Sequence, residues 1–130
     1  MRHRSIEIDG LRHKAPIPMA AAIGPLLCTS AIMGIDPTTD HEPADPAAQI
    51  TLAFRNLEHV LHNAGFSAED VVHLAVLLSS DDYRELVNEQ WTRMFPVSED
   101  RPARHTTLTA FKPGRVVQLE AICFKDSGES

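Results

Sequence analysis

The residues best suited to chemistry lie close together, in the stretch 102–125. Arg104 stands there among residues that favour strands, and Gln118 and Glu120 follow it. Because side chains alternate along a strand, Gln118 and Glu120 project from one face. This face combines two polar and two apolar residues: Val116, Gln118, Glu120 and Ile122. Its mixed character suits a subunit interface that contains a polar cleft.

Each of these side chains also has an ordinary structural explanation. Arg104 could form a salt bridge at the surface or at an interface. Gln118 could bond across an interface, and Glu120 could pair there with an arginine or a backbone amide. On a regular strand His105 points away from Arg104, which favours a structural position or one at the rim of a site.

Histidines and cysteines offer weaker candidates. His59 and His62 have the i, i+3 spacing of zinc ligands, but no third ligand is near in sequence and their neighbours are polar. A solvated helix face is therefore favoured, and no metal site is expected. Cys28 and Cys123 lie in apolar runs, and the chain shows no signal peptide. We expect two reduced, buried thiols in a cytoplasmic protein.

The stretch around Arg104 is predicted to fold as an antiparallel hairpin. Residues that favour strands flank the break Lys112-Pro113-Gly114 on both sides. Alternate residues of the second strand are all apolar, so their face belongs to a core; they are Val117, Leu119, Ala121 and Cys123.

The elements before this hairpin follow from hydrophobic period and from turn residues. The prediction has strands over 5–9 and 26–35, an extended loop or edge strand over 13–20, and a strand over 70–79. One helix is predicted from Asp45-Pro46 to Gly65, and a second begins at 80–82 and ends near Phe95. Trp91, on the second helix, is expected in the core or at the edge of a cleft.

The predicted fold class is α+β, with the order β-β-α-β-α-β-β. Each helix has one apolar stripe, so both are expected on the same face of one mixed sheet. The other face of the sheet is then too apolar for water, which predicts association. Residues 1–125 are expected to form a single domain, and 126–130 a flexible C-terminal tail.

Composition excludes several classes of protein. The chain has 130 residues and a net charge of −6 with histidine neutral, and its Lys and Arg do not cluster. A nucleic-acid partner is therefore not expected. No apolar run approaches the roughly 20 residues of a membrane helix, so no membrane contact is expected.

Several short segments share one order and spacing with a known family. They are 26–31 followed by Ile35-Asp36-Pro37, then Asn56-Leu57, Gly65, Val71-Val72, Val87-Asn88-Glu89, Pro102-Ala103-Arg104 and Leu119-Glu120-Ala121-Ile122. Together they resemble the Rid (YjgF) family of enamine and imine deaminases over residues 14–125. The resemblance implies a fold like trimeric chorismate mutase and a homotrimer with clefts between subunits. It also implies hydrolysis without a cofactor, in which water attacks a small 2-imino carboxylate and releases ammonia and a 2-keto acid.

The resemblance assigns roles to particular residues. Arg104 would bind the substrate carboxylate, because a guanidinium is bidentate and permanently charged and an ammonium is not bidentate. Gln118 or Glu120 would orient the water. The remaining expected substrate-binding residues are Ile17, Ser30, Ala31 and Thr106.

This sequence departs from the family pattern at several of these positions. Gln118 replaces the usual Glu, Ala31 a Gly and Ile17 a Tyr, and His105-Thr106 replaces the common Ser-Cys. Because Gln cannot take a proton, the departures indicate a divergent deaminase with another substrate, or one with weak or no activity. The alternative is a non-catalytic trimer that binds small carboxylates or protein partners. A ribonuclease is a third choice, which the acidic charge disfavours.

Overall fold

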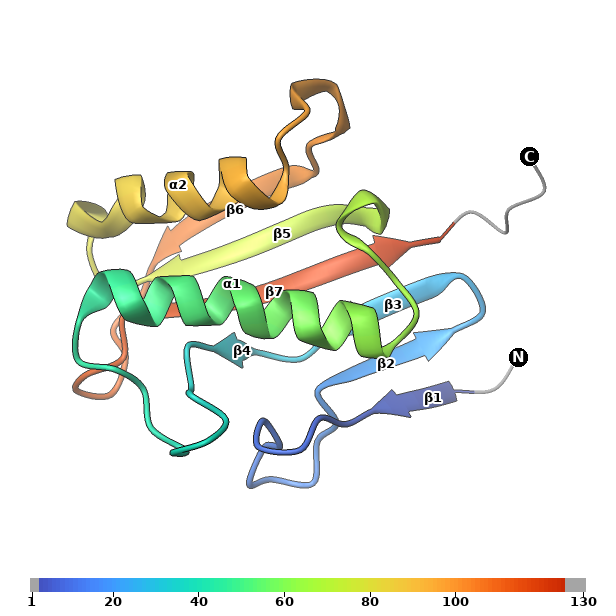
Figure 1. Cartoon of the computed structure of the whole chain (residues 1–130), viewed down its shortest axis with the longest axis horizontal. Coiled ribbons are helices and arrows are strands. Elements are labelled where there is room, and N and C mark those ends of the chain that lie inside the picture. The colour runs from blue at the N-terminus through green and yellow to red at the C-terminus, as the bar shows by residue number, and fades with distance from the viewer. Residues whose placement is uncertain (1–2, 126–130) are drawn as a thin grey trace.

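The computed structural model describes residues 3–125, which form one mixed sheet covered on one face by two helices (Figure 1). The strands are β1 (His3–Ile6), β2 (Ala20–Ile23), β3 (Leu26–Thr29), β4 (Ile32–Met33), β5 (Val71–Leu78), β6 (Ala103–Leu108) and β7 (Val117–Phe124). The helices are α1 (Pro46–Asn63) and α2 (Arg84–Met94), with short 3₁₀ turns at Ala68–Asp70, Asp81–Tyr83 and Ser98–Asp100. The predicted tail, 126–130, lies outside the described residues.

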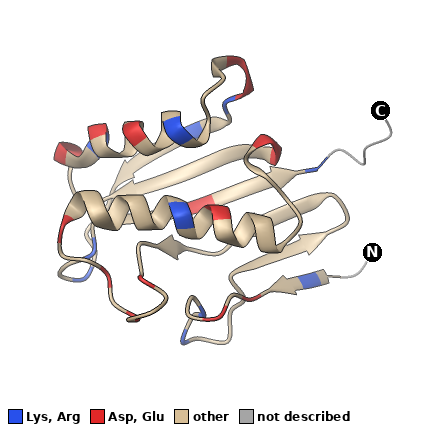
Figure 2. Cartoon of the chain, in the orientation of Figure 1, with Lys and Arg blue, Asp and Glu red and all other residues tan. Residues whose placement is uncertain are grey.

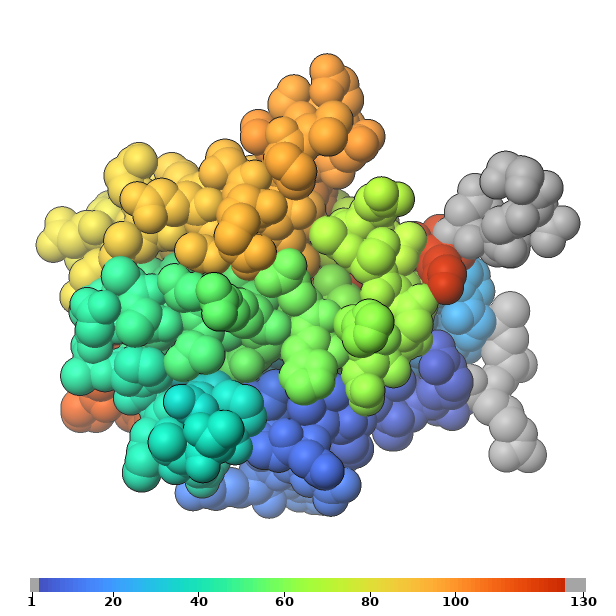
Figure 3. Space-filling model, viewed as in Figure 1, coloured from blue at the N-terminus to red at the C-terminus, as the bar shows by residue number. Residues whose placement is uncertain are grey.

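The strand order is β1-β2-β3-β7-β5-β6, with β4 also paired to β7. Strands β5 and β6 are parallel, and all other neighbouring pairs are antiparallel. This confirms the predicted α+β class, the mixed sheet and the placement of both helices on one face. In the space-filling view the two helices cover most of the sheet on that side (Figure 3).

Local chemistry fixes α1 where the sequence predicted it. The Asp45 side chain accepts a hydrogen bond from the Ala48 amide at 3.2 Å, and Pro46 occupies the first turn. The helix ends before Gly65, whose φ of +83° is a conformation that glycine adopts without strain. Fully buried residues of α1, among them Ile50, Phe54 and Leu57, pack against the sheet.

The predicted hairpin of β6 and β7 is wrong, because β5 lies between them. β6 pairs in parallel with one edge of β5, and β7 pairs antiparallel with the other. Leu74, Val76 and Leu78 of β5 are fully buried, so this apolar strand occupies a central position in which both of its edges are hydrogen-bonded. Residues 109–116 carry the chain past the end of β5 before β7 begins.

The predicted strand over 26–35 is two strands, with a break at Ser30-Ala31. Both pair with β7, but Cys28 opposes Ile122 while Ile32 opposes Leu119, so the register shifts by one residue. At the shift, the Thr29 hydroxyl accepts a hydrogen bond from the Ala121 amide at 2.9 Å in place of a backbone carbonyl.

The N-terminal strands also differ from the prediction. The first strand is His3–Ile6 in place of 5–9, and β2 begins only at Ala20, after the proline-containing loop. β2 was not predicted as a separate strand, because its sequence, Ala-Ala-Ala-Ile, has little strand preference of its own. Pairing with β1 and β3 stabilises it.

The face of the sheet without helices carries exposed apolar side chains. We call these residues the open-face patch: Ile23, Leu26, Cys28, Ile122 and Phe124. The strand register makes them neighbours, and Phe124 is 54% exposed. The prediction of two buried thiols is therefore correct for Cys123 and wrong for Cys28, which lies on the exposed face. No helix among residues 3–125 has the length and apolar character needed to cross a bilayer.

Candidate functional site

Arg104 lies on β6, at the outer edge of the sheet, and its side chain extends towards α2. Its Nε donates to the Thr106 hydroxyl at 3.1 Å, and its Nη2 donates to Asn88 Oδ1 at 2.8 Å. The guanidinium carbon is 5.1 Å from the centre of the Trp91 ring, a cation–π distance. Trp91 is itself held edge-on by Phe95, with ring centres 4.8 Å apart. Side chains from one strand and one helix thus fix the guanidinium.

The half-buried Arg104 has no carboxylate partner among residues 3–125. The ion pairs formed among residues 3–125 involve other side chains, and the two bonds described above use only two of its five N–H donors. Burial lowers the pKa of Arg104, and the nearby Arg84 lowers it further. A cation in this state attracts an anionic ligand, since a carboxylate would supply both the missing charge and the missing acceptors.

Gln118 and Glu120 lie on the opposite face of the sheet from Arg104. Arg104 is in register with the fully buried Leu74, on the helix side. Gln118 and Glu120 alternate with buried residues of β7, so they project from the open face. There the Gln118 amide donates to Glu120 Oε2 at 3.4 Å. Within one chain the predicted carboxylate-binding and water-binding groups are therefore separated.

Of the other predicted residues, Thr106 lies beside Arg104, and Ser30, Ala31 and Ile17 lie in other parts of the molecule. Thr106 is beside Arg104, as its hydrogen bond shows. Ser30 and Ala31 form the break between β3 and β4, two strands away from Arg104 across β7 and β5. Ile17, 49% exposed, lies in the loop before β2. His105 alternates with the half-buried Arg104 and is exposed, as expected for a residue that points the other way.

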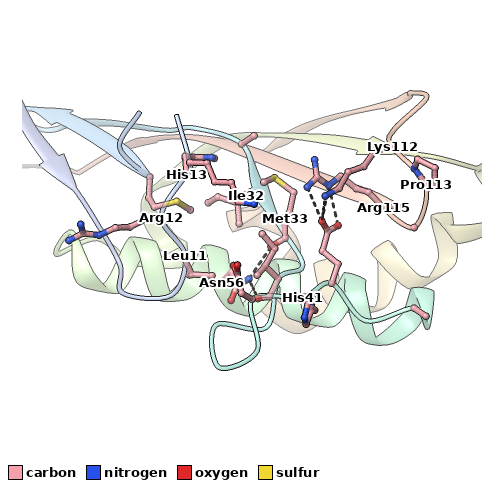
Figure 4. Close-up of a pocket in the computed structure, with 18 residues that line it drawn as sticks. Leu11, Arg12, His13, Ile32, Met33, His41, Asn56, Lys112, Pro113 and Arg115 are labelled. Carbon is pink, nitrogen blue, oxygen red and sulfur yellow. Dashed lines mark hydrogen bonds and ion pairs between the residues drawn. The ribbon is translucent and has the colours of Figure 1, made fainter. Parts of the chain in front are cut away.

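A pocket of about 450 Å³, which we call the β4 pocket, opens beside β4 and includes Ala31 (Figure 4). Two buried amides hold its walls. Asn56 Nδ2 donates to the carbonyls of Met33 and Ile35, at 2.9 and 2.8 Å, and so fixes the end of β4. The fully buried Gln49 donates to Pro43 and Gly114.

The side-chain oxygen of Gln49, Oε1, completes this connection by accepting a hydrogen bond from the Val116 amide at 2.7 Å. One side chain of α1 therefore joins the loop before the helix to the turn before β7. Gly34 contributes close packing, because a Cβ there would lie only 2.0 Å from the backbone carbonyl oxygen of Gln49.

Sequence reasoning did not identify several of these residues as parts of a site. Asn88 and Trp91 are three residues apart on α2, which places both beside Arg104, but the pairing of a helix with a distant strand cannot be read from local periodicity. His59 and His62 are exposed, as predicted. Within 3–125, no three or more His, Cys, Asp or Glu side chains are grouped in a way that could hold a metal ion.

Comparisons with known proteins agree with this architecture. The family model described as endoribonuclease L-PSP matches residues 13–123. A crystal structure of RidA from an Antarctic Psychrobacter species has a TM-score of 0.84 and 28% sequence identity, and the match covers 93% of this chain and 98% of that one. The fold is the chorismate-mutase-like fold of such proteins.

Two curated relatives carry names that describe a reaction. A protein of Acinetobacter baylyi named 3-aminoacrylate deaminase RutC is 27% identical, over 83% of this chain and 86% of its own length. A protein of Escherichia coli named 2-iminobutanoate/2-iminopropanoate deaminase is also 27% identical, over 85% of this chain and 88% of its own.

Proposed function

The chain belongs to the Rid family, whose family model is described as endoribonuclease L-PSP, and on this premise we propose that it is a hydrolytic deaminase that uses no cofactor. Its substrates are small enamine or 2-imino carboxylates, and its products are ammonia and a 2-keto acid. The names of the two deaminase relatives support this class of substrate.

The observation that carries the proposal is the state of Arg104. A half-buried guanidinium without a carboxylate partner, held by Asn88, Thr106 and Trp91, is prepared to bind an anion of the ligand. The planar carboxylate of an imino acid matches its free donors in a bidentate arrangement. Because Asn88 and Trp91 already fix the guanidinium, little side-chain entropy is lost on binding.

We propose that the complete site forms between copies of the chain, in a homotrimer. Arg104 and Thr106 are at the β6 edge, whereas Gln118, Ser30 and Ala31 are on or beyond β7. One copy can supply the first group and its neighbour the second. The open-face patch supports association, since Leu26, Ile122 and Phe124 are 42%, 43% and 54% exposed in the single chain.

The chemistry then follows from the groups present. Arg104 orients the substrate by its carboxylate, and the Gln118–Glu120 pair accepts hydrogen bonds from a water and directs its oxygen to the C=N carbon. A bond forms from this oxygen to carbon as the C=N π pair moves to nitrogen. Glu120 takes the proton that the water loses, since Gln118 cannot. Glu120 passes this proton to the nitrogen, which gives an aminol. Transfer of the hydroxyl proton to the same nitrogen then lets the oxygen lone pair form the C=O bond as the C–N bond breaks, which leaves ammonia and the keto acid.

A coupled assay with freshly generated 2-aminoacrylate and longer imines tests the proposal. The wild-type protein should accelerate release of the keto acid, and Arg104→Ala should lose about 100-fold in kcat/KM, because the charge-assisted pair with the carboxylate is gone. Arg93→Ala is the matched control, since Arg93 is an exposed arginine of α2 paired with Glu58. Its kcat/KM should stay within about twofold of the wild-type value.

Failure to accelerate hydrolysis of any imine over buffer would contradict the deaminase. In that case Gln118 favours the second candidate, a trimer that binds small carboxylates or protein partners without catalysis. Arg104-dependent binding of a stable 2-keto acid, without turnover of the imine, would support this alternative.

A further inference from the structure

The β4 pocket carries more positive charge than the rest of the chain. Its lining includes four basic side chains and two carboxylates, in a protein whose net charge is −6. The basic residues are Arg12, Lys14, Lys112 and Arg115, and the acidic ones are Asp40 and Glu42. The cations come from the loop after β1 and from the turn before β7, which lie along the same side of the molecule (Figure 2). Figure 4 shows Arg12 at one end of the pocket and Lys112 with Arg115 at the other.

The cations differ in how far they are neutralised. The Glu42 carboxylate accepts from Arg115 at 2.8–3.1 Å and lies 3.8 Å from Lys112, and the side chains of Glu42 and Arg115 are only 11% and 19% exposed. Arg12 and Lys14 form no ion pair with any residue in 3–125. At one end of the pocket Arg115 is therefore paired with Glu42, and at the other end Arg12 and Lys14 are exposed and have no ion-pair partner among residues 3–125.

The floor of the pocket is apolar, and one of its polar atoms has no partner. Met19 and Ile32, 3% and 0% exposed, line it together with Met33. His13 Nε2 is buried and has no hydrogen-bond partner among the described residues. An unsatisfied buried nitrogen is costly, and an oxygen of a ligand in the pocket would satisfy it. An apolar floor with a few polar groups is the usual composition of a small-molecule site.

Two lining residues place the pocket close to the water-binding side of the proposed deaminase site. Met33, one of its lining residues, is the cross-strand neighbour of Gln118. Ala31, an expected substrate-binding residue, lines it as well. A ligand held near Gln118 could therefore extend a side chain across Met33 into the β4 pocket.

We propose that the β4 pocket binds a second anionic group of the substrate, so that the protein prefers imines of dicarboxylic amino acids. This inference rests on the proposed function, because it takes from it the binding of the first carboxylate by Arg104. The methylene groups of the substrate lie on the apolar floor, and the distal carboxylate pairs with Arg12 and Lys14. Imines of three or four carbons without a second charge would leave the pocket largely empty.

Calorimetric titration with two stable keto acids of equal chain length, 2-oxoglutarate and 2-oxopentanoate, tests this directly. The wild-type protein should bind the dicarboxylate about tenfold more tightly. The double variant Arg12→Ala/Lys14→Ala should bind both acids equally. Glu42→Gln should increase the preference severalfold, because it releases Arg115 and Lys112 from their carboxylate. The control Arg55→Ala/Arg93→Ala removes two cations from the helices and should keep the wild-type ratio.

Equal affinity for the two acids in the wild-type protein would overturn the inference, as would failure of 2-oxoglutarate to bind. A preference that persists in Arg12→Ala/Lys14→Ala would overturn it as well. Arg104→Ala separates this result from the proposed function, because it should raise Kd for both acids by the same factor. If Arg104→Ala has no effect while the preference remains, the pocket stands and the assignment of Arg104 fails.

Discussion

At the scale of single residues, the site depends on how Arg104 is held. Three side chains fix its guanidinium, and two of them, Asn88 and Trp91, come from one helix. In the sequence, Asn88 belongs to a segment that resembles the family, and Trp91 is predicted in the core or at the edge of a cleft; neither is predicted to contact Arg104. In the structure the Trp91 ring lies against the Arg104 guanidinium, which has no carboxylate partner within the described part of the chain. Trp91 is therefore a positioning residue for the proposed carboxylate-binding group.

Trp91→Leu should raise KM for the imine, and Kd for a stable keto acid, by about three- to tenfold, because the cation–π contact is lost. Trp91→Phe should recover most of the loss. In an Arg104→Ala background, Trp91→Leu should have no further effect on Kd. A ring with a merely structural role would weaken binding in that background too. If Trp91→Leu weakens binding equally in both backgrounds, the ring does not act through Arg104.

At the scale of elements, the sequence predicts correctly the features that depend on local contacts and wrongly those that depend on long-range strand pairing. Asp45-Pro46 and Gly65 determine the ends of α1 by contacts within a few residues, so the helix was correctly predicted. The partners of β5 depend on strands that are distant in sequence, and β6 and β7 were therefore wrongly paired with each other. The break at Ser30-Ala31 has the same origin, since it follows from the register on β7. As a result the sequence could propose site residues but could not show that they divide between two faces.

The alternation of side chains along neighbouring strands places the two cysteines in different environments. Cys123 is fully buried on the helix side of β7, while Cys28 on the adjacent β3 faces outwards. Burial raises the pKa of the Cys123 thiol to about 12, with smaller contributions from Asp70 and Cys28. An unfolded thiol loses its proton near pH 9, so between about pH 9 and 12 the folded state holds a proton that the unfolded state has lost. This stabilising contribution is complete below pH 9 and declines as pH rises.

The free energy of unfolding should therefore fall by about 1.4 kcal/mol per pH unit above pH 9 through this group. Urea unfolding from pH 8 to 10.5 should show a shallower decline in Cys123→Ala than in the wild-type protein. Cys123→Ala also loses packing, but this loss is constant with pH and does not change the slope. The exposed Cys28→Ser serves as the control and should keep the wild-type slope. Identical slopes for all three proteins would show that the Cys123 proton does not stabilise the fold.

At the scale of the whole molecule, the sheet separates what the proposed reaction must bring together. Arg104 extends towards α2 at the β6 edge, and Ala31 lies at the β4 pocket, with β5 and β7 between them. No rearrangement of side chains can join these groups within one chain, since two hydrogen-bonded strands intervene. The open-face patch provides an apolar surface for association. A site shared between copies connects these two features.

Complementation between inactive variants tests the shared site. Arg104→Ala removes the carboxylate-binding half, and Ala31→Trp fills the other half with a bulky side chain, so each variant alone should be inactive. In the proposed homotrimer, assembled from an equal mixture of the two variants, about one quarter of the interfaces should combine two intact halves and recover activity. Two different tags, with mass spectrometry of the purified mixed trimers, establish that subunits have exchanged. Mixed trimers that remain inactive would place both halves of the site in one chain, whereas recovery near a quarter of the wild-type rate requires that neighbouring copies build it together.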